Sequence, residues 1–157
     1  MLARDYDLDC SIAHSLELIG ERWSLLVIRD VFLGNRRFDE IQAELGIARN
    51  VLASRLGRLM DDGILEKRPY QERPVRYEYF LTEKGLDLWP VLVALMAFGD
   101  KHGLPEGVEP PVRIVHKECG GLVNDRRICE RCGAELNVRD ARAVSTRSAA
   151  DREPAAA

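Results

Sequence analysis

The chain of 157 residues lacks a long apolar run. Its longest, residues 89–98, falls well short of the roughly 20 residues that a membrane-spanning helix needs. The first seven residues carry acids where a secretory signal needs a basic stretch followed by an apolar one. We therefore expect a cytoplasmic protein without a membrane partner. The pI of about 5.7 and net charge of −3 exclude a histone-like protein that coats nucleic acid indiscriminately.

The sequence also lacks the usual signs of an enzyme. It contains no glycine-rich phosphate loop and no pair of residues placed as a general acid and base. The four cysteines are unevenly distributed, and three of them fall within residues 119–132. In the cytoplasm, cysteines are more often metal ligands or reactive thiols than disulfide partners. These absences favour a binding protein over a catalyst.

Hydrophobic spacing predicts a mainly α-helical chain with one small β-hairpin (an α+β fold). Four successive helices are expected, at residues 10–19, 23–33, 38–44 and 48–62. Two strands, residues 64–70 and 76–81, would flank a loop at residues 71–75. A last helix would start after an N-cap at Thr82 and end near His102, with Pro90 kinking or breaking it.

These elements suggest four segments. Residues 1–103 would form the main domain, and the proline-rich residues 104–111 would link it to a cysteine-bearing unit at residues 112–138. Residues 139–157 are rich in Ala, Arg and Asp and have few large apolar side chains, so we expect a disordered tail.

The helix at residues 48–62 has the features of a DNA-reading helix. Leu52, Leu56 and Leu59 recur at helical spacing and should face the core, which leaves small and polar side chains outward. Small side chains let a helix enter the major groove, where Asn and Arg can read base edges. The first turns would reach deepest, so the base-edge candidates are Arg49, Asn50, Ala53 and Ser54.

Other arginines suit the phosphate backbone of the duplex. Arg55 and Arg58 lie further along the same helix, and Arg73 and Arg76 lie in or beside the hairpin loop. Two more, Arg36 and Arg37, precede the short helix. The competing interpretation is a solvated surface on which arginines pair with neighbouring acids. A further alternative is a protein-interaction adaptor that uses these elements without binding duplex DNA.

Several motifs resemble the HxlR family of bacterial winged helix-turn-helix (MarR-like) transcription regulators. The resemblance covers about residues 8–103, and it rests on Cys10-Ser11-Ile12-Ala13, Ile19-Gly20-Glu21-Arg22-Trp23-Ser24-Leu25-Leu26, Gly34-Asn35-Arg36-Arg37-Phe38-Asp39-Glu40-Ile41, Val51-Leu52-Ala53-Ser54-Arg55-Leu56, Asp62-Gly63-Ile64-Leu65 and Tyr79-Phe80-Leu81-Thr82-Glu83-Lys84-Gly85. It implies a sequence-specific DNA-binding regulator with a recognition helix and a wing. One departure is Ala48, where the family often has Ser before the recognition helix.

Dimerisation is expected on two grounds. The last long helix is apolar over more than one face, and a second copy of the chain is the simplest cover for the surplus face. The family resemblance implies a homodimer formed through the first and last long helices. A two-fold dimer would bind a pseudo-palindromic operator with half-sites about 34 Å apart. The sequence names no effector.

The cysteine-bearing unit holds two matching half-motifs, His116-x-x-Cys119-Gly120 and Cys129-x-x-Cys132-Gly133. Two residues between ligands allow a tight turn to present both to one metal ion. Together the half-motifs predict a structural Zn²⁺ site with Cys₃His ligands in a small C-terminal zinc ribbon. The alternatives are a reactive thiol cluster or a disulfide formed under oxidation.

Cys10 stands apart at the start of the first helix. A helix N-terminus lowers the pKa of a thiol, which makes Cys10 a possible redox sensor. The other interpretation is a small residue buried at a dimer contact.

Overall fold

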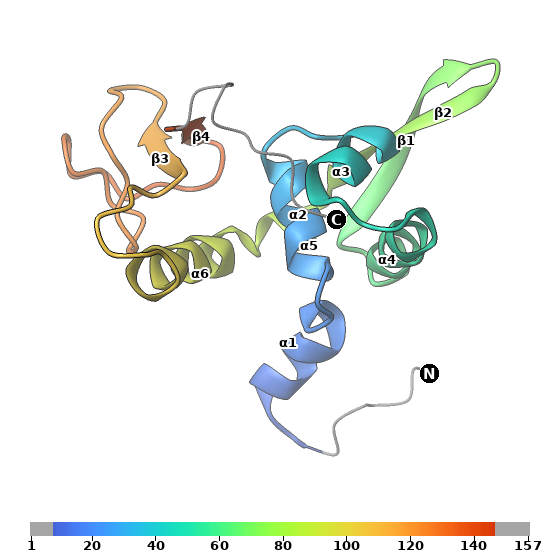
Figure 1. Cartoon of the computed structure of the whole chain (residues 1–157), viewed down its shortest axis with the longest axis horizontal. Helices are drawn as coiled ribbons and strands as arrows, with labels where there is room; N and C mark the ends of the chain where they lie inside the picture. The colour runs from blue at the N-terminus through green and yellow to red at the C-terminus, as the bar shows by residue number, and fades with distance from the viewer. Residues whose placement is uncertain (1–7, 147–157) are drawn as a thin grey trace. The chain divides into compact units, whose positions relative to one another are not determined.

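The computed structural model describes residues 8–146, in two compact units that meet between Gly85 and Leu86 (Figure 1). The sequence placed the boundary later, after Gly103. The difference arises because the last long helix packs with the strands that follow it, where Val93 and Ile114 line the same cavity. Among the described residues, no helix has the length and apolar character needed to cross a bilayer.

The first unit consists of four helices followed by a hairpin. The helices are α1 (Ser11–Ile19), α2 (Ser24–Phe32), α3 (Phe38–Leu45) and α4 (Arg49–Asp61). Their bounds agree closely with the sequence prediction. The α3–α4 turn passes through Gly46 at φ +61°, a left-handed conformation that favours glycine.

The core of this unit is built from one face of each of its central helices. Val27 and Ile28 of α2 and Ile41 of α3 are completely buried. They are joined by the leucines predicted to face inward on α4, which are also buried: Leu52, Leu56 and Leu59. Each buried leucine contributes about 1.5–3 kcal/mol, so this stripe fixes the rotation of α4 about its axis.

Strands β1 (Leu65–Glu72) and β2 (Val75–Leu81) form an antiparallel hairpin that extends from the helices (Figure 1). Only Arg73 and Pro74 connect them, so the loop is shorter than the predicted residues 71–75. The strands extend further because Gln71 and Glu72 join the pairing register. The Gln71 side-chain amide also donates to the carbonyls of Arg73 and Pro74, at 3.2 and 3.1 Å.

The predicted last helix is broken in two, as Pro90 indicated. The short α5 (Glu83–Leu86) starts where the Thr82 hydroxyl accepts a hydrogen bond of 3.1 Å from the Gly85 amide, which confirms the N-cap. Helix α6 (Trp89–His102) then begins with Pro90 in its first turn, where a missing N–H is tolerated.

The second unit adds a two-stranded sheet to α6. Strands β3 (Val112–His116) and β4 (Ala141–Ser145) pair antiparallel, from Val112 with Ser145 to His116 with Ala141. This corrects the expected end of the ribbon at residue 138 and the start of a disordered tail at 139. Apolar and polar side chains alternate only weakly in Ala141–Ser145, so the sequence alone did not predict a strand there. The segment forms a strand because it pairs with β3, which is distant in sequence. The rest of the expected tail, residues 147–157, lies outside the described residues.

Two glycines allow the packing of the first unit to be tested. We expect Gly85→Ala to lower the free energy of unfolding by about 2 kcal/mol or more. A Cβ atom at Gly85 would lie 2.3 Å from the Ile64 carbonyl oxygen. Gly57→Ala is the control, because nothing lies within 4 Å of its added Cβ on α4. It should instead raise stability by about 0.5–1 kcal/mol. Equal urea midpoints for Gly85→Ala and the parent would contradict the packing.

Candidate functional site

The outward face of α4 carries small and polar side chains. Asn50, Ala53 and Ser54 are all exposed, opposite the buried leucine stripe. No large side chain of α4 lies among these three, so the backbone of α4 could come close to the floor of a wide groove. The helix starts at Ala48, which is the N-cap residue and provides no side-chain cap.

Arg49 opens α4 and is held by residues of α3. Its side chain is 72% exposed, and its Nη1 atom lies 3.4 Å from Asp39 Oδ1. Its guanidinium group also lies over the Phe38 ring, 4.7 Å from the centroid. The first arginine of the helix therefore has a defined orientation at the surface.

Arg36 and Arg37 fasten the start of α3 to the hairpin. The guanidinium of Arg36 lies over the Phe80 ring at 4.6 Å, and that of Arg37 lies over the Tyr70 ring at 4.4 Å. Arg37 Nε also donates to Glu78 Oε1 at 3.0 Å, and this hydrogen bond raises the pKa of Arg37. Both arginines keep exposed edges while they position the hairpin beside the helices.

Two predicted backbone-contact residues are instead engaged with acids. Arg55 is only 15% exposed, and its Nη1 atom lies 2.9 Å from Glu21 Oε2, close but without hydrogen-bond alignment. Arg58 Nε donates to Asp62 Oδ2 at 2.9 Å, one helical turn away. For these two residues the competing interpretation, arginines paired with acids, describes the contacts better than free phosphate ligands.

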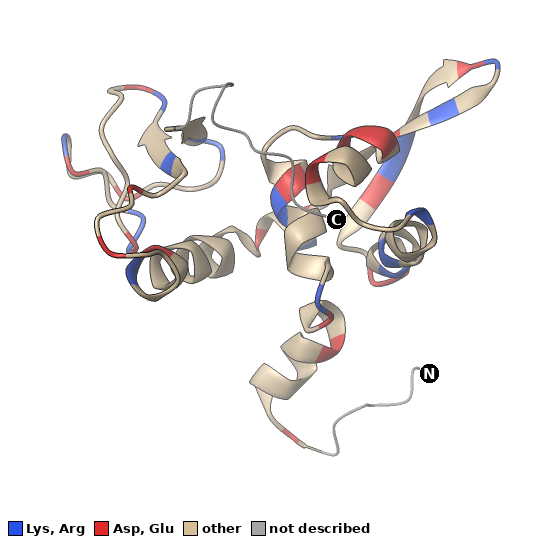
Figure 2. Cartoon of the chain, viewed as in Figure 1, with Lys and Arg blue, Asp and Glu red and all other residues tan. Residues whose placement is uncertain are grey.

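The hairpin carries the least restrained arginines. Arg73 at its turn and Arg76 on β2 are exposed, and neither has an ion pair within residues 8–146. On β1, Lys67 lies over the Tyr77 ring at 4.6 Å and was not predicted as a contact residue, whereas Arg68, which the sequence placed near the loop, is bound to Glu66. Figure 2 shows positive charge along this hairpin. The signal available in the sequence was that two consecutive cations, Lys67 and Arg68, must point to opposite faces of the hairpin, so both faces should be solvated.

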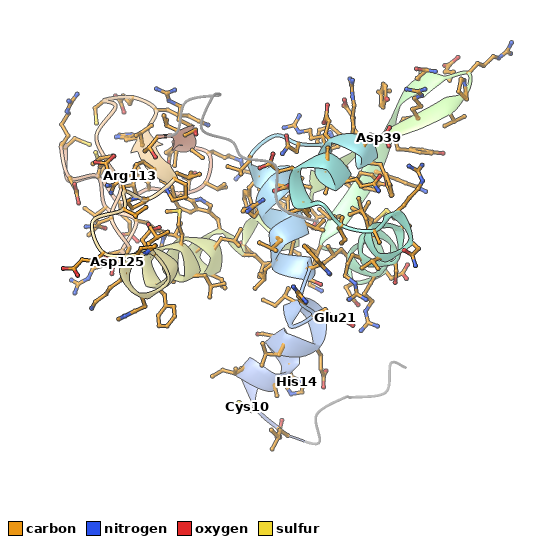
Figure 3. All side chains as sticks on the ribbon, in the orientation of Figure 1. Cys10, His14, Glu21, Asp39, Arg113 and Asp125 are labelled. Atoms are coloured by element: carbon orange, nitrogen blue, oxygen red, sulfur yellow. The ribbon has the colours of Figure 1, made fainter. Side chains whose placement is uncertain are left out.

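A cavity of about 610 Å³ lies between the hairpin and the starts of α3 and α4. Its wall contains guanidinium groups, aromatic rings, one valine and two acids. The lining residues are Arg37, Phe38, Asp39, Glu40, Arg49, Tyr70, Val75, Arg76, Tyr77 and Tyr79. Figure 3 shows Asp39 at the start of α3. The wall thus carries three guanidinium groups and two carboxylates, and acids already contact two of those arginines, Arg37 and Arg49.

The second unit brings all four predicted metal-ligating side chains together. The ligand atoms of His116, Cys119, Cys129 and Cys132 lie within 4.8 Å of one another. His116 Nδ1 is 3.2 Å from the Cys119 sulfur and 3.3 Å from the Cys132 sulfur, and the Cys119 and Cys129 sulfurs are 3.4 Å apart. In a tetrahedral zinc site, bond lengths near 2.0–2.3 Å separate the ligand atoms by roughly 3.5–3.8 Å. The cluster is therefore compact enough to hold a metal ion.

The two half-motifs form matching turns. The Gly120 amide donates to the His116 carbonyl and the Gly133 amide donates to the Cys129 carbonyl, each at 2.8 Å. Both glycines have positive φ, at +70° and +74°, which explains the residue type after each ligand pair. The backbone amides of Cys132 and Arg131 help to lower the pKa of Cys129 to about 6, which favours the thiolate that binds metal.

Cys10 is exposed at the start of α1, so the single chain does not bury it. Its pKa is lowered by the backbone amides of Ala13 and Ile12. Figure 3 shows Cys10 at one end of α1 and Glu21 beyond the other. A response of this thiol to oxidants stays a prediction.

Two helices expose apolar rows. On α1, Ile12 and Leu16 lie one turn apart and are 70% and 43% exposed. On α6, a longer row follows the same spacing and is also exposed: Val91, Leu95 and Phe98. The row on α6 corresponds to the surplus apolar face predicted for the last long helix, and the row on α1 lies on the other helix that the family resemblance implies for a dimer contact.

Comparisons with known proteins agree with this architecture. Residues 18–106 match the family profile described as HxlR-like helix-turn-helix. The HTH-type transcriptional regulator Rv3095 of Mycobacterium tuberculosis is 44% identical over 130 residues, which cover 83% of this chain and 82% of that protein. The relatives and the fold are those of transcriptional regulators, not of enzymes.

Solved structures confirm the winged helix-turn-helix fold. The crystal structure of PA1607, a candidate transcription factor, matches with a TM-score of 0.70 and 36% identity, covering 90% of this chain and 97% of that one. The reduced form of the transcriptional regulator YodB from Bacillus subtilis matches with a TM-score of 0.51 and 35% identity, over 60% of this chain and 95% of its own. Because the first unit, which ends at Gly85, is only about half of the chain, the PA1607 match must extend into the second unit.

Proposed function

Because the chain belongs to the HxlR-like helix-turn-helix family, we propose that two copies of it bind duplex DNA in a sequence-specific manner. In each copy α4 would enter the major groove, and the β1–β2 hairpin would lie on the minor groove or the phosphate backbone. The observation that carries the proposal is the outward face of α4, where Asn50, Ala53 and Ser54 are exposed between positively charged neighbours.

The arginines divide into two roles. Arg49 and Asn50 would read base edges, because they occupy the first turn of α4. Arg73, Arg76 and the exposed edges of Arg36 and Arg37 would hold phosphates. Arg55 and Arg58 are left out of the proposed contact set, since acids of the first unit already engage both.

A homodimer would present two recognition helices at once. The exposed rows on α1 and α6 support this, since contiguous apolar side chains on a monomer usually mark an interface. Two-fold symmetry would then require a pseudo-palindromic operator with half-sites about 34 Å apart.

We further propose that His116, Cys119, Cys129 and Cys132 hold a structural Zn²⁺ ion. The donor set is closed, with four protein ligands, which is typical of structural rather than catalytic zinc. The surrounding core is small, because β3 and β4 bury few apolar side chains. A metal ion would supply the folding energy that this core does not: structural zinc in small domains binds with about 10–16 kcal/mol.

Recognition of the DNA upstream of the protein's own gene is tested with two variants. Asn50→Ala should reduce discrimination between this duplex and a scrambled one by about 5- to 150-fold, the value of a bidentate base contact. Arg73→Ala should weaken binding to both duplexes alike and make the log–log salt slope shallower by about one unit. Fluorescence anisotropy over a salt series measures both effects.

Arg126→Ala is the matched control, because Arg126 is an exposed arginine of the second unit. It should bind both duplexes like the parent. If Asn50→Ala and Arg73→Ala also behaved like the parent, the proposed contact surface would be wrong.

The metal proposal predicts about one zinc ion per chain by elemental analysis. Cys132→Ser should lose the ion and speed up amide exchange in β3, because one missing ligand opens the site and β3 holds His116. Cys10→Ser is the control, because Cys10 belongs to the first unit and is not one of the four proposed ligands, and it should keep both the zinc and the slow exchange. Zinc content unchanged in Cys132→Ser would refute the assigned ligand set.

The dimer proposal is tested on α6. Phe98, 66% exposed, ends the apolar row, and Phe98→Asp should raise the dimer dissociation constant at least about 100-fold. An unpaired carboxylate buried at an interface costs about 3–5 kcal/mol. Lys101→Asp, exposed on the same helix outside the row, should remain dimeric. Sedimentation equilibrium measures both variants, and a dimeric Phe98→Asp protein would exclude this face.

A further inference from the structure

The cavity beside α4 contains an acid that the fold does not require. Of the two carboxylates in its wall, Glu40 has a structural role, since its Oε2 atom accepts hydrogen bonds from the Arg36 and Arg37 amides at 3.1 and 3.0 Å. Asp39 makes no comparable backbone bond among residues 8–146. Its contact is the exposed guanidinium of Arg49, 3.4 Å away. As an acid in the first turn of α3, Asp39 gains a little stability from the helix dipole, but this does not explain its placement against Arg49.

The pair contributes little to folding. Asp39 is 82% exposed and Arg49 is 72% exposed, and solvated ion pairs of this kind add little to stability. What the pair does provide is orientation. Arg49 is restrained by the Phe38 ring at 4.7 Å and by the Asp39 carboxylate, which engages only one of its five N–H donors.

We propose that Asp39 is a specificity-determining residue that positions Arg49 for a guanine edge and opposes binding to non-cognate DNA. The inference rests on the proposed function and deepens it. A guanidinium already oriented by a carboxylate loses less freedom when it forms the bidentate contact to guanine O6 and N7. The free donors of Arg49 would make that contact, while Asp39 would remain bound to its other edge.

The negative charge of Asp39 also affects binding to DNA of any sequence. A carboxylate near the duplex repels phosphates whether or not the correct base is present. Only a site with guanine in register with Arg49 offsets that repulsion. Asp39 would therefore lower affinity for all DNA and lower it least for the operator, which is discrimination by an unfavourable contact.

The distinguishing consequence is that affinity and specificity should move in opposite directions. Asp39→Asn and Asp39→Ala remove the charge and release Arg49 to take a phosphate. Both variants should bind a scrambled duplex at least about tenfold more tightly, with a log–log salt slope steeper by about 0.9, the value for one added phosphate contact. The ratio of scrambled to upstream-duplex dissociation constants should fall by about tenfold.

Anisotropy titrations with both duplexes test this, with Glu44→Gln as the control. Glu44 is an exposed acid on the same helix, and its loss changes the net charge equally without touching Arg49. It should leave the ratio unchanged. An unchanged ratio in both Asp39 variants overturns the inference, and so does an equal fall in Glu44→Gln, which would reduce the effect to net charge.

A double-mutant cycle separates positioning from direct contact. If Asp39 acts through Arg49, Asp39→Asn should barely change the ratio in an Arg49→Ala background. A full tenfold fall in that background would overturn the positioning role. A parent protein that bound both duplexes equally would instead refute the proposed function itself, so the two failures are distinguishable.

Discussion

The burial of three leucines on α4 is the interaction on which the rest of the first unit depends. Leu52, Leu56 and Leu59 are at most 1% exposed, and together they contribute several kcal/mol to folding. A solvated ion pair contributes about 0–1 kcal/mol, so surface charges cannot rotate the helix against this stripe. The outward direction of Asn50 and Ser54 is therefore a consequence of core packing, and it holds whatever partner approaches.

The arginines of the first unit differ in how strongly contacts restrain their side chains. Arg55 and Arg58 are tied to acids and serve the fold. Arg36, Arg37 and Arg49 lie on aromatic rings, which restrain the guanidinium plane and leave its outer edge open to a ligand. Arg73 and Arg76 of the hairpin have neither an acid partner nor a ring contact within residues 8–146. The restrained guanidinium groups therefore lie at the starts of α3 and α4, and the unrestrained ones lie on the hairpin, where contacts to a phosphate backbone need less exact placement.

Local patterns in the sequence predicted the helices of the first unit, the break at Pro90, the cap at Thr82 and the meeting of four ligands from two half-motifs. Each depends on residues within a turn or a short loop of one another. The features that could not be predicted from the sequence depend on residues that are far apart along the chain. Glu21 and Arg55 are far apart in sequence, so Arg55 was taken for a free cation. Strand β4 exists only because β3 pairs with it, and the unit boundary at Gly85 reflects which side chains α6 meets.

The contact between Glu21 and Arg55 also has an energetic consequence. Glu21 lies in the turn just after α1, and Arg55 belongs to α4, so one ion pair joins the amino-terminal helix to the reading helix within the first unit. Breaking this contact would leave the largely shielded guanidinium of Arg55 without its acid, so the placement of the turn after α1 and the packing of α4 are energetically linked.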